Sequence, residues 1–146
     1  PISDIEGMVI GGHSDLGMVP LTSHATRNSI KVSEFINDER LEQVKNETKV
    51  GGATLTKLLG TSAWYAPGAA VSSLVQSIAC NQNKIFPCSA LLDGEYGIYD
   101  LCIGVPLILG SNGIEKIIEI KLNKDDKTQL KNSADGVEKT NKLLNF

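Results

Sequence analysis

Cysteine is scarce in this 146-residue chain, and its spacing excludes two kinds of stabilising site. The three cysteines, Cys80, Cys88 and Cys102, are odd in number and form no C-x-x-C pair. Such a set indicates neither a disulfide framework nor a zinc site. Because free cysteine is among the most buried residue types, we expect three buried thiols without a chemical role.

Long apolar runs and clusters of basic residues are missing as well. No apolar stretch reaches the roughly 18 residues that a membrane span needs, and the first residues lack the basic start and apolar stretch of a signal peptide. The 14 basic residues are scattered among 17 acidic ones, so the net charge of −3 gives no positive field for a phosphate backbone. The sequence therefore predicts a cytoplasmic protein that binds neither membrane nor nucleic acid.

The chain does contain enough apolar material for one folded domain. Hydrophobic residues make up 41 % of the sequence, and this length suits a single core. No internal repeat or low-complexity tract divides the chain. It opens on Pro1 without an initiator methionine and runs at once into a strand-like segment. We therefore expect a piece of a longer protein, with a processed terminus as the alternative.

The alternation of apolar segments and turn residues predicts an α+β domain in which antiparallel strands pack with long helices. Short glycine-containing turns between the later strands favour antiparallel pairing. The expected strands are residues 8–10, 18–21, 85–92, 101–109 and 114–122.

Three helices are expected from caps and apolar spacing. The first begins at Asn37 and Asp38, with a weak point at Gly51-Gly52. The second, after Pro67, is apolar on too many sides for a surface helix and should be central. The third begins at Asn123 and carries apolar positions at three- and four-residue spacing as far as Leu144.

One side chain stands out chemically. His13 follows Gly11-Gly12 at the end of the apolar strand 8–10, where glycines let the backbone turn tightly and a ligand approach closely. Histidine, with an ordinary pKa of about 6.5, can accept and return a proton near neutral pH. Asp15 is near in sequence, but adjacency is poor evidence of a hydrogen bond. Taken alone, the Gly-Gly-His motif favours a structural histidine, as does the setting of His24.

Four collinear segments carry a family resemblance. Residues 11–21 are similar to G-G-H-G-D-x-M-V-P-L, residues 62–67 to S-A-Y-Y-A-P, residues 87–97 to P-x-S-A-x-L-x-G-E-Y-G, and residues 104–113 to G-V-P-x-x-L-G-x-x-G. Together they cover nearly the whole chain and resemble the lactate/malate dehydrogenase family, in particular its lactate-dehydrogenase-like malate dehydrogenases.

The resemblance implies the C-terminal, substrate-binding half of an NAD-dependent malate dehydrogenase, which interconverts malate and oxaloacetate in the tricarboxylic acid cycle. His13 falls on the family's catalytic histidine, which takes the hydroxyl proton of malate as hydride leaves for NAD. Ala63 and Pro67 fall on the helix that lines the family's substrate pocket, although packing alone explains both about as well. A homo-oligomer is implied too.

Two departures from the family pattern concern residues 12–17, the loop that carries His13 and is called the histidine loop below. Ser14 stands where the family has glycine, and Leu16-Gly17 replaces a single residue, so the loop is longer by one. The glycine-rich dinucleotide fingerprint, the substrate-clamping arginines and the aspartate that pairs with the catalytic histidine lie upstream in the family. We therefore assign residues 1–146 to the C-terminal domain alone. NAD is expected to bind mainly to an N-terminal Rossmann domain outside this chain, which leaves the isolated chain inactive.

Two alternatives stay open. Lactate dehydrogenase shares the chemistry, and the residue that selects the substrate belongs to the missing half, although residues 62–67 favour malate. A non-catalytic interaction domain with the same scaffold is the other alternative.

Overall fold

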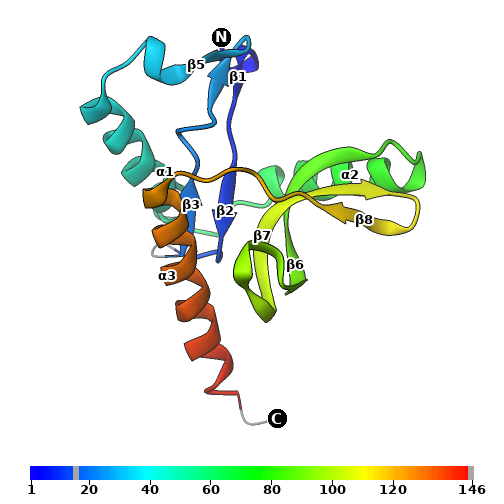
Figure 1. The fold of residues 1–146 in the computed structure, drawn as a ribbon. Coiled ribbons are helices and arrows are strands. Elements are labelled where there is room, and N and C mark those ends of the chain that lie inside the picture. The colour runs from blue at the N-terminus through cyan, green and yellow to red at the C-terminus, as the bar shows by residue number, and fades with distance from the viewer. Residues whose placement is uncertain (15–16, 145–146) are drawn as a thin grey trace.

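The computed structural model describes residues 1–14 and 17–144, which form two antiparallel sheets and three α-helices (Figure 1). The small sheet has the order β1-β4-β5, with β1 at Ile5–Glu6, β4 at Thr26–Arg27 and β5 at Ile30–Lys31. Short 3₁₀ helices occupy Ile2–Asp4, Val32–Glu34 and Glu95–Gly97. The α+β prediction is confirmed.

The main sheet holds the candidate site. Its order is β3-β2-β7-β6, and β8 lies along the far end of β7. The strands are β2 (Val9–Gly11), β3 (Met18–Pro20), β6 (Lys84–Asp93), β7 (Tyr99–Gly110) and β8 (Gly113–Ile117). All pairings in this sheet are antiparallel. Those among β6, β7 and β8 confirm the prediction from the short turns.

The last strand is shorter than the sequence predicts. We expected a strand as far as Leu122, but β8 ends at Ile117. Tyr96 explains the change, because its hydroxyl donates to the carbonyl of Ile118 at 2.8 Å and accepts from the amide of Ile120 at 3.0 Å. These bonds replace a strand partner as the chain leaves the sheet and crosses toward the third helix.

Helix α1 spans Asp38–Leu59 and begins as predicted, with Oδ1 of Asn37 accepting from the amide of Arg40 at 2.9 Å. The weak point expected at Gly51-Gly52 produces no interruption, because the helix runs through both glycines without a break. Apart from the adjoining helical backbone, no heavy atom lies within 4 Å of a Cβ built on either glycine. The neighbouring helical turns offset the modest propensity cost of the two glycines.

Helix α2, at Tyr65–Ala79, is where the prediction of a central helix is wrong. It is buried only at Ser77, whose hydroxyl donates to the carbonyl of Leu109 at 2.8 Å, and Leu74 packs against the core from the same side. Val71 and Val75 are each 57 % exposed. Helix α2 is apolar on several faces, and the described residues cover only the face that carries Leu74 and Ser77.

Helix α3, at Lys124–Asn141, starts with Oδ1 of Asn123 accepting from the amide of Asp126 at 2.8 Å. It buries Leu130 and Ala134 in the core. Leu144, which the spacing placed on the same apolar stripe, lies beyond the helix and is 54 % exposed. The end of α3 points away from the main sheet (Figure 1).

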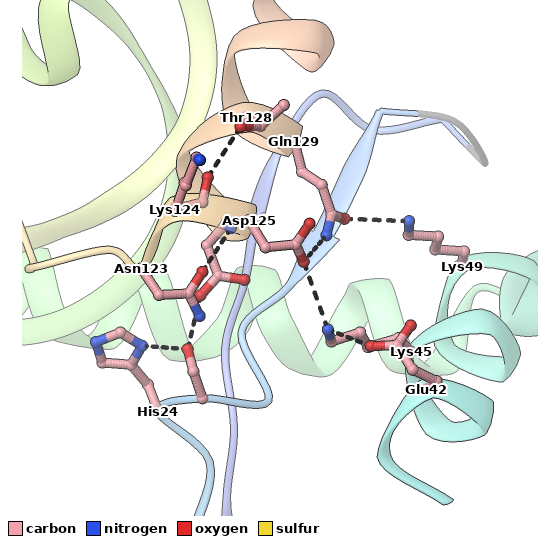
Figure 2. Close-up of polar contacts among 11 residues, drawn as sticks. His24, Glu42, Lys45, Lys49, Asn123, Lys124, Asp125, Thr128 and Gln129 are labelled. Carbon is pink, nitrogen blue, oxygen red and sulfur yellow. Dashed lines mark hydrogen bonds and ion pairs between the residues drawn. The ribbon is translucent and has the colours of Figure 1, made fainter. Parts of the chain in front are cut away.

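Polar contacts hold α1 against α3 at the end nearest β3 (Figure 2). Lys45 lies 3.8 Å from a carboxylate oxygen of Asp125, and Lys49 donates to Gln129 at 3.4 Å. The pKa of Lys45 is raised: burial lowers it, but the hydrogen bond to Glu42 and the charges of Glu42 and Asp125 outweigh that effect. The contacts fix the start of α3 relative to the main sheet.

The core lies between the main sheet and α3, and strand alternation sets which residues enter it. In β7 the odd-numbered residues from 101 to 109 face the core, where Leu101, Ile103, Val105, Leu107 and Leu109 are buried. Cys102 therefore points to the opposite face. The expectation of three buried thiols is wrong, because Cys80 and Cys102 are exposed and Cys88 is half-buried.

No helix within residues 1–14 and 17–144 combines the length and apolar character that crossing a membrane requires.

Candidate functional site

His13 is presented at the edge of the main sheet by the end of strand β2. Gly11, the last strand residue, pairs with Met18 on one side and with Gly104 on the other. It adopts φ +91°, a conformation that side chains disfavour. Gly12 is buried, and His13 directly after it is exposed. The chain thus turns from the interior to the surface within two residues.

The glycines at this turn are required by close backbone packing. A Cβ on Gly104 would lie 2.6 Å from the carbonyl oxygen of Gly11, and a Cβ on Gly11 would lie 2.4 Å from that of Gly17. Neither contact is sterically possible. Three backbone segments therefore meet directly beside His13, and none has room for a side chain.

Ser14, which departs from the family pattern, closes the longer loop. The amide of Gly17 donates to both the carbonyl and the hydroxyl oxygen of Ser14, at 2.9 and 3.0 Å. The amide of Met18 donates to the same carbonyl at 3.0 Å. A serine side chain thus supplies one acceptor for the turn. Asp15, considered as a partner of His13, and Leu16 lie outside the described residues.

His13 borders a depression of about 540 Å³ on the surface of the main sheet. Strands β2, β3, β6 and β7 and helix α3 contribute to its walls, which are mostly apolar or small: Val9, Ile10, Gly11, Gly12, Met18, Pro87, Cys88, Ser89, Cys102, Ile103, Gly104 and Val137. Burial raises the pKa of the Cys88 thiol, so this cysteine stays protonated. Among the described residues of the wall, His13 is the group suited to proton exchange near neutral pH.

The other two residues assigned to the site lie elsewhere. Ala63 is half-buried just before α2, and Pro67 is exposed in the first turn of that helix. Neither lines the depression beside His13. Within the described residues, the site therefore consists of a histidine and an open apolar surface, and the α2 start is a separate surface feature.

The described residues do not fit a dinucleotide. The strand pairings are all antiparallel, and Gly11-Gly12 leads into a loop, whereas Gly51-Gly52 lies inside α1. A dinucleotide cradle needs a glycine turn between a strand and a helix. In the same part of the chain, no three histidine, cysteine or acidic side chains are grouped so that they could hold a metal ion.

Ser133 belongs to this site and was missed by the sequence reasoning. It lies on the buried face of α3, is 3 % exposed, and contacts the backbone on both sides of the histidine loop. The available signal was a serine within the apolar stripe formed by Leu130, Ala134 and Val137. A hydroxyl at such a position needs a buried partner.

The comparisons with known proteins agree with this architecture. Residues 3–144 match the family described as lactate/malate dehydrogenase, alpha/beta C-terminal domain. The chain belongs to this family and corresponds to that domain.

Malate dehydrogenases are among the relatives by sequence. The protein from Bacteroides fragilis is 58 % identical over 142 residues, which are 97 % of this chain and 45 % of the relative. The protein from Flavobacterium frigidimaris is 55 % identical over 144 residues, or 99 % of this chain and 46 % of the relative. The chain thus spans about half the length of the curated relatives it matches.

Solved structures give the same result. Malate dehydrogenase from Salinibacter ruber superimposes with a TM-score of 0.93 at 44 % identity, covering 97 % of this chain and 46 % of that structure. Lactate dehydrogenase from Eimeria maxima, solved with NADH and oxamate, gives 0.92 at 38 % identity, covering 98 % and 46 %. The backbone is therefore common to enzymes named for both substrates.

Proposed function

We propose that the full protein containing this chain is an NAD-dependent malate dehydrogenase, which interconverts malate and oxaloacetate in the tricarboxylic acid cycle. The observation that carries the proposal is the 58 % identity to a malate dehydrogenase across 97 % of the chain. The exposed histidine beside an open depression is consistent with it. A cytoplasmic location stays a prediction from the sequence.

In this proposal His13 is the proton acceptor and donor. It takes the proton from the hydroxyl of malate while the adjacent carbon loses hydride, and it returns the proton when oxaloacetate is reduced. The tight turn at Gly11-Gly12 supports this role because it places the imidazole outside the sheet, where a substrate can reach it.

Ala63 and Pro67 are proposed to line the substrate pocket of the complete enzyme. Both side chains are small and lie at the start of α2, which leaves space for the second carboxylate of malate. They are not beside the depression at His13, so this assignment requires further walls from outside the described residues. A homo-oligomer would place additional chains near the open faces of α2.

NAD is proposed to bind mainly to an N-terminal domain of the same protein, where it would accept the hydride. The absence of a strand–turn–helix cradle from the described residues supports this division. On the same ground, residues 1–146 alone are expected to bind NAD very weakly and to lack turnover.

Lactate dehydrogenase activity is the second candidate function. The TM-score of 0.92 to the Eimeria maxima lactate dehydrogenase supports it. The substrate-selecting residue is expected upstream of this chain. The two candidates differ in which 2-oxo acid the full protein reduces with NADH.

Initial rates of NADH oxidation with oxaloacetate and with pyruvate, measured on the full protein, test the proposal. We expect oxaloacetate to be preferred by at least an order of magnitude. His13→Asn should lower kcat by about 10²–10⁴, the usual contribution of general acid–base catalysis, while leaving NADH binding unchanged. Preferred pyruvate reduction would move the assignment to lactate dehydrogenase. A folded His13→Asn enzyme with normal turnover would remove the histidine from the mechanism.

A further inference from the structure

We propose that Ser133 is a positioning residue for His13, and that its hydroxyl fixes the two ends of the histidine loop against helix α3. This inference rests on the proposed function of His13. It concerns a residue 120 positions away in the sequence whose hydroxyl bonds to the backbone on either side of His13.

One hydroxyl makes both contacts. Oγ of Ser133 accepts a hydrogen bond from the amide of Gly12 at 2.7 Å and donates one to the carbonyl of Gly17 at 2.7 Å. Gly12 directly precedes His13, and Gly17 lies at the other end of the loop. The side chain therefore ties the start of the loop to its end.

The two bonds link α3 to both ends of this loop. Ser133, Gly12 and Gly17 are all buried, so water does not readily replace a lost partner. An alanine at position 133 leaves the Gly12 amide without its acceptor and the Gly17 carbonyl without this donor. The local response is a displacement of the Gly12 backbone, which carries His13 with it.

The backbone at the start of the histidine loop also packs closely against helix α3 around the Ser133 hydroxyl. A Cβ on Gly12 would lie 3.0 Å from Cγ2 of Val137, one turn further along α3, and a Cβ on Gly11 would lie 2.9 Å from the Ser133 hydroxyl. The helix is thus seated directly on the glycine backbone. A shift of the helix at this point changes where the loop leaves the sheet.

The effect on catalysis follows from geometry. General acid–base catalysis requires the imidazole within hydrogen-bond reach of the proton that it moves, and a misplacement of about 1 Å can cost as much as 10²-fold in rate. Ser133 therefore influences kcat through the position of His13, with little effect on nucleotide binding.

The test uses the full enzyme in four forms: wild type, Ser133→Ala, His13→Asn and the double variant. We expect Ser133→Ala to lower kcat about tenfold or more with the KM for NADH within twofold of wild type. In the His13→Asn background the same change should lower the residual rate less than twofold, because the group that it positions is already gone.

Ser77→Ala is the matched control. Ser77 is also fully buried and its hydroxyl also donates to a main-chain carbonyl, that of Leu109 at 2.8 Å, but it lies on α2 away from the loop. Both serine variants should lower the melting temperature, and only Ser133→Ala should lower kcat. Hydrogen exchange of a peptide spanning residues 8–18, followed by mass spectrometry, should be faster in Ser133→Ala alone.

Each outcome separates the two proposals. Unchanged kcat and exchange in Ser133→Ala, or an equal loss of rate with and without His13, would overturn the positioning role and leave the proposed function intact. Wild type without oxaloacetate reduction would overturn the proposed function, and a folded His13→Asn enzyme with normal turnover would overturn the role of His13 on which the positioning depends. In either case the exchange measurement still reports whether Ser133 holds the loop.

Discussion

The hydroxyl of Ser23 donates a 2.7 Å hydrogen bond to Oδ2 of Asp126, a carboxylate that is only 1 % exposed. The bond joins the segment after β3 to the first turn of α3, 103 residues away. Asp126 also occupies the N-terminal turn of its helix, where a negative charge interacts favourably with the helix dipole. A buried charge with these two interactions anchors the start of α3.

We expect Asp126→Ala to lower the free energy of unfolding by about 1–3 kcal/mol, since it removes a buried charged hydrogen bond and a favourable helix-terminal charge. The neighbouring residue provides the control. Asp125 is 65 % exposed and pairs with Lys45 at 3.8 Å, so Asp125→Ala should cost less than about 1 kcal/mol. Urea unfolding measures both. Equal costs for the two variants would argue against Asp126 as an anchor.

Tyr96 should make the fold sensitive to alkaline pH. Its phenol is partly buried, and burial raises its pKa, opposed by the hydrogen bond from Ile120 and assisted by the charge of Glu119. An unfolded tyrosine loses its proton near pH 10, before the folded one does. Above that pH the unfolded state binds fewer protons than the folded state. The contribution of Tyr96 to the free energy of unfolding is therefore complete below about pH 10 and is lost as the pH rises through the pKa of the folded state.

The corresponding experiment compares urea unfolding at pH 8 and pH 10.5. Tyr96→Phe should cost about 1–2 kcal/mol at pH 8, because the Ile118 carbonyl and the Ile120 amide lose a partner. The variant should also show a smaller further loss at pH 10.5 than wild type. Tyr65→Phe, at a residue 87 % exposed, should retain the wild-type difference. An unchanged pH difference in Tyr96→Phe would assign the alkaline loss to other groups.

The three thiols should react at different rates. Cys80 and Cys102 are exposed, whereas Cys88 is half-buried and its pKa is raised by burial. Alkylation proceeds through the thiolate, so at pH 8 iodoacetamide should label Cys80 and Cys102 first and Cys88 last. Peptide mass spectrometry over a time course follows each site. Early labelling of Cys88 would mean that the depression beside His13 activates its thiol.

The isolated chain is expected to self-associate through α2. Val71 and Val75 are exposed apolar residues on the same side of that helix, and contiguous apolar surfaces tend to be covered by partners. Sedimentation at high micromolar concentration should give a dimer or larger species, which Val71→Glu with Val75→Glu should dissociate. Ser72→Glu with Gln76→Glu adds the same charge to other faces and should not. A strictly monomeric wild-type chain would contradict this expectation.

Much of the fold could be read from the sequence because its causes are local. Asn37 and Asn123 cap their helices through amides only three residues away, and short glycine turns leave antiparallel pairing as the available geometry for β6, β7 and β8. The ordered motifs also identified the family. His13 could be singled out because the glycines that present it are adjacent to it.

The tertiary structure decided what depends on distant neighbours. The apolar composition of α2 indicated more apolar faces than one domain covers, but only the fold shows that Ser77 lies on the covered face, and strand register turned Cys102 away from the core. A serine within the apolar stripe of α3 indicates that Ser133 needs a buried partner, but only the fold shows that one partner is Gly12, 121 positions away. Burial and hydrogen bonding between remote segments are properties of the packed chain, because a residue's propensity and spacing carry no information about which backbone atoms will lie beside it.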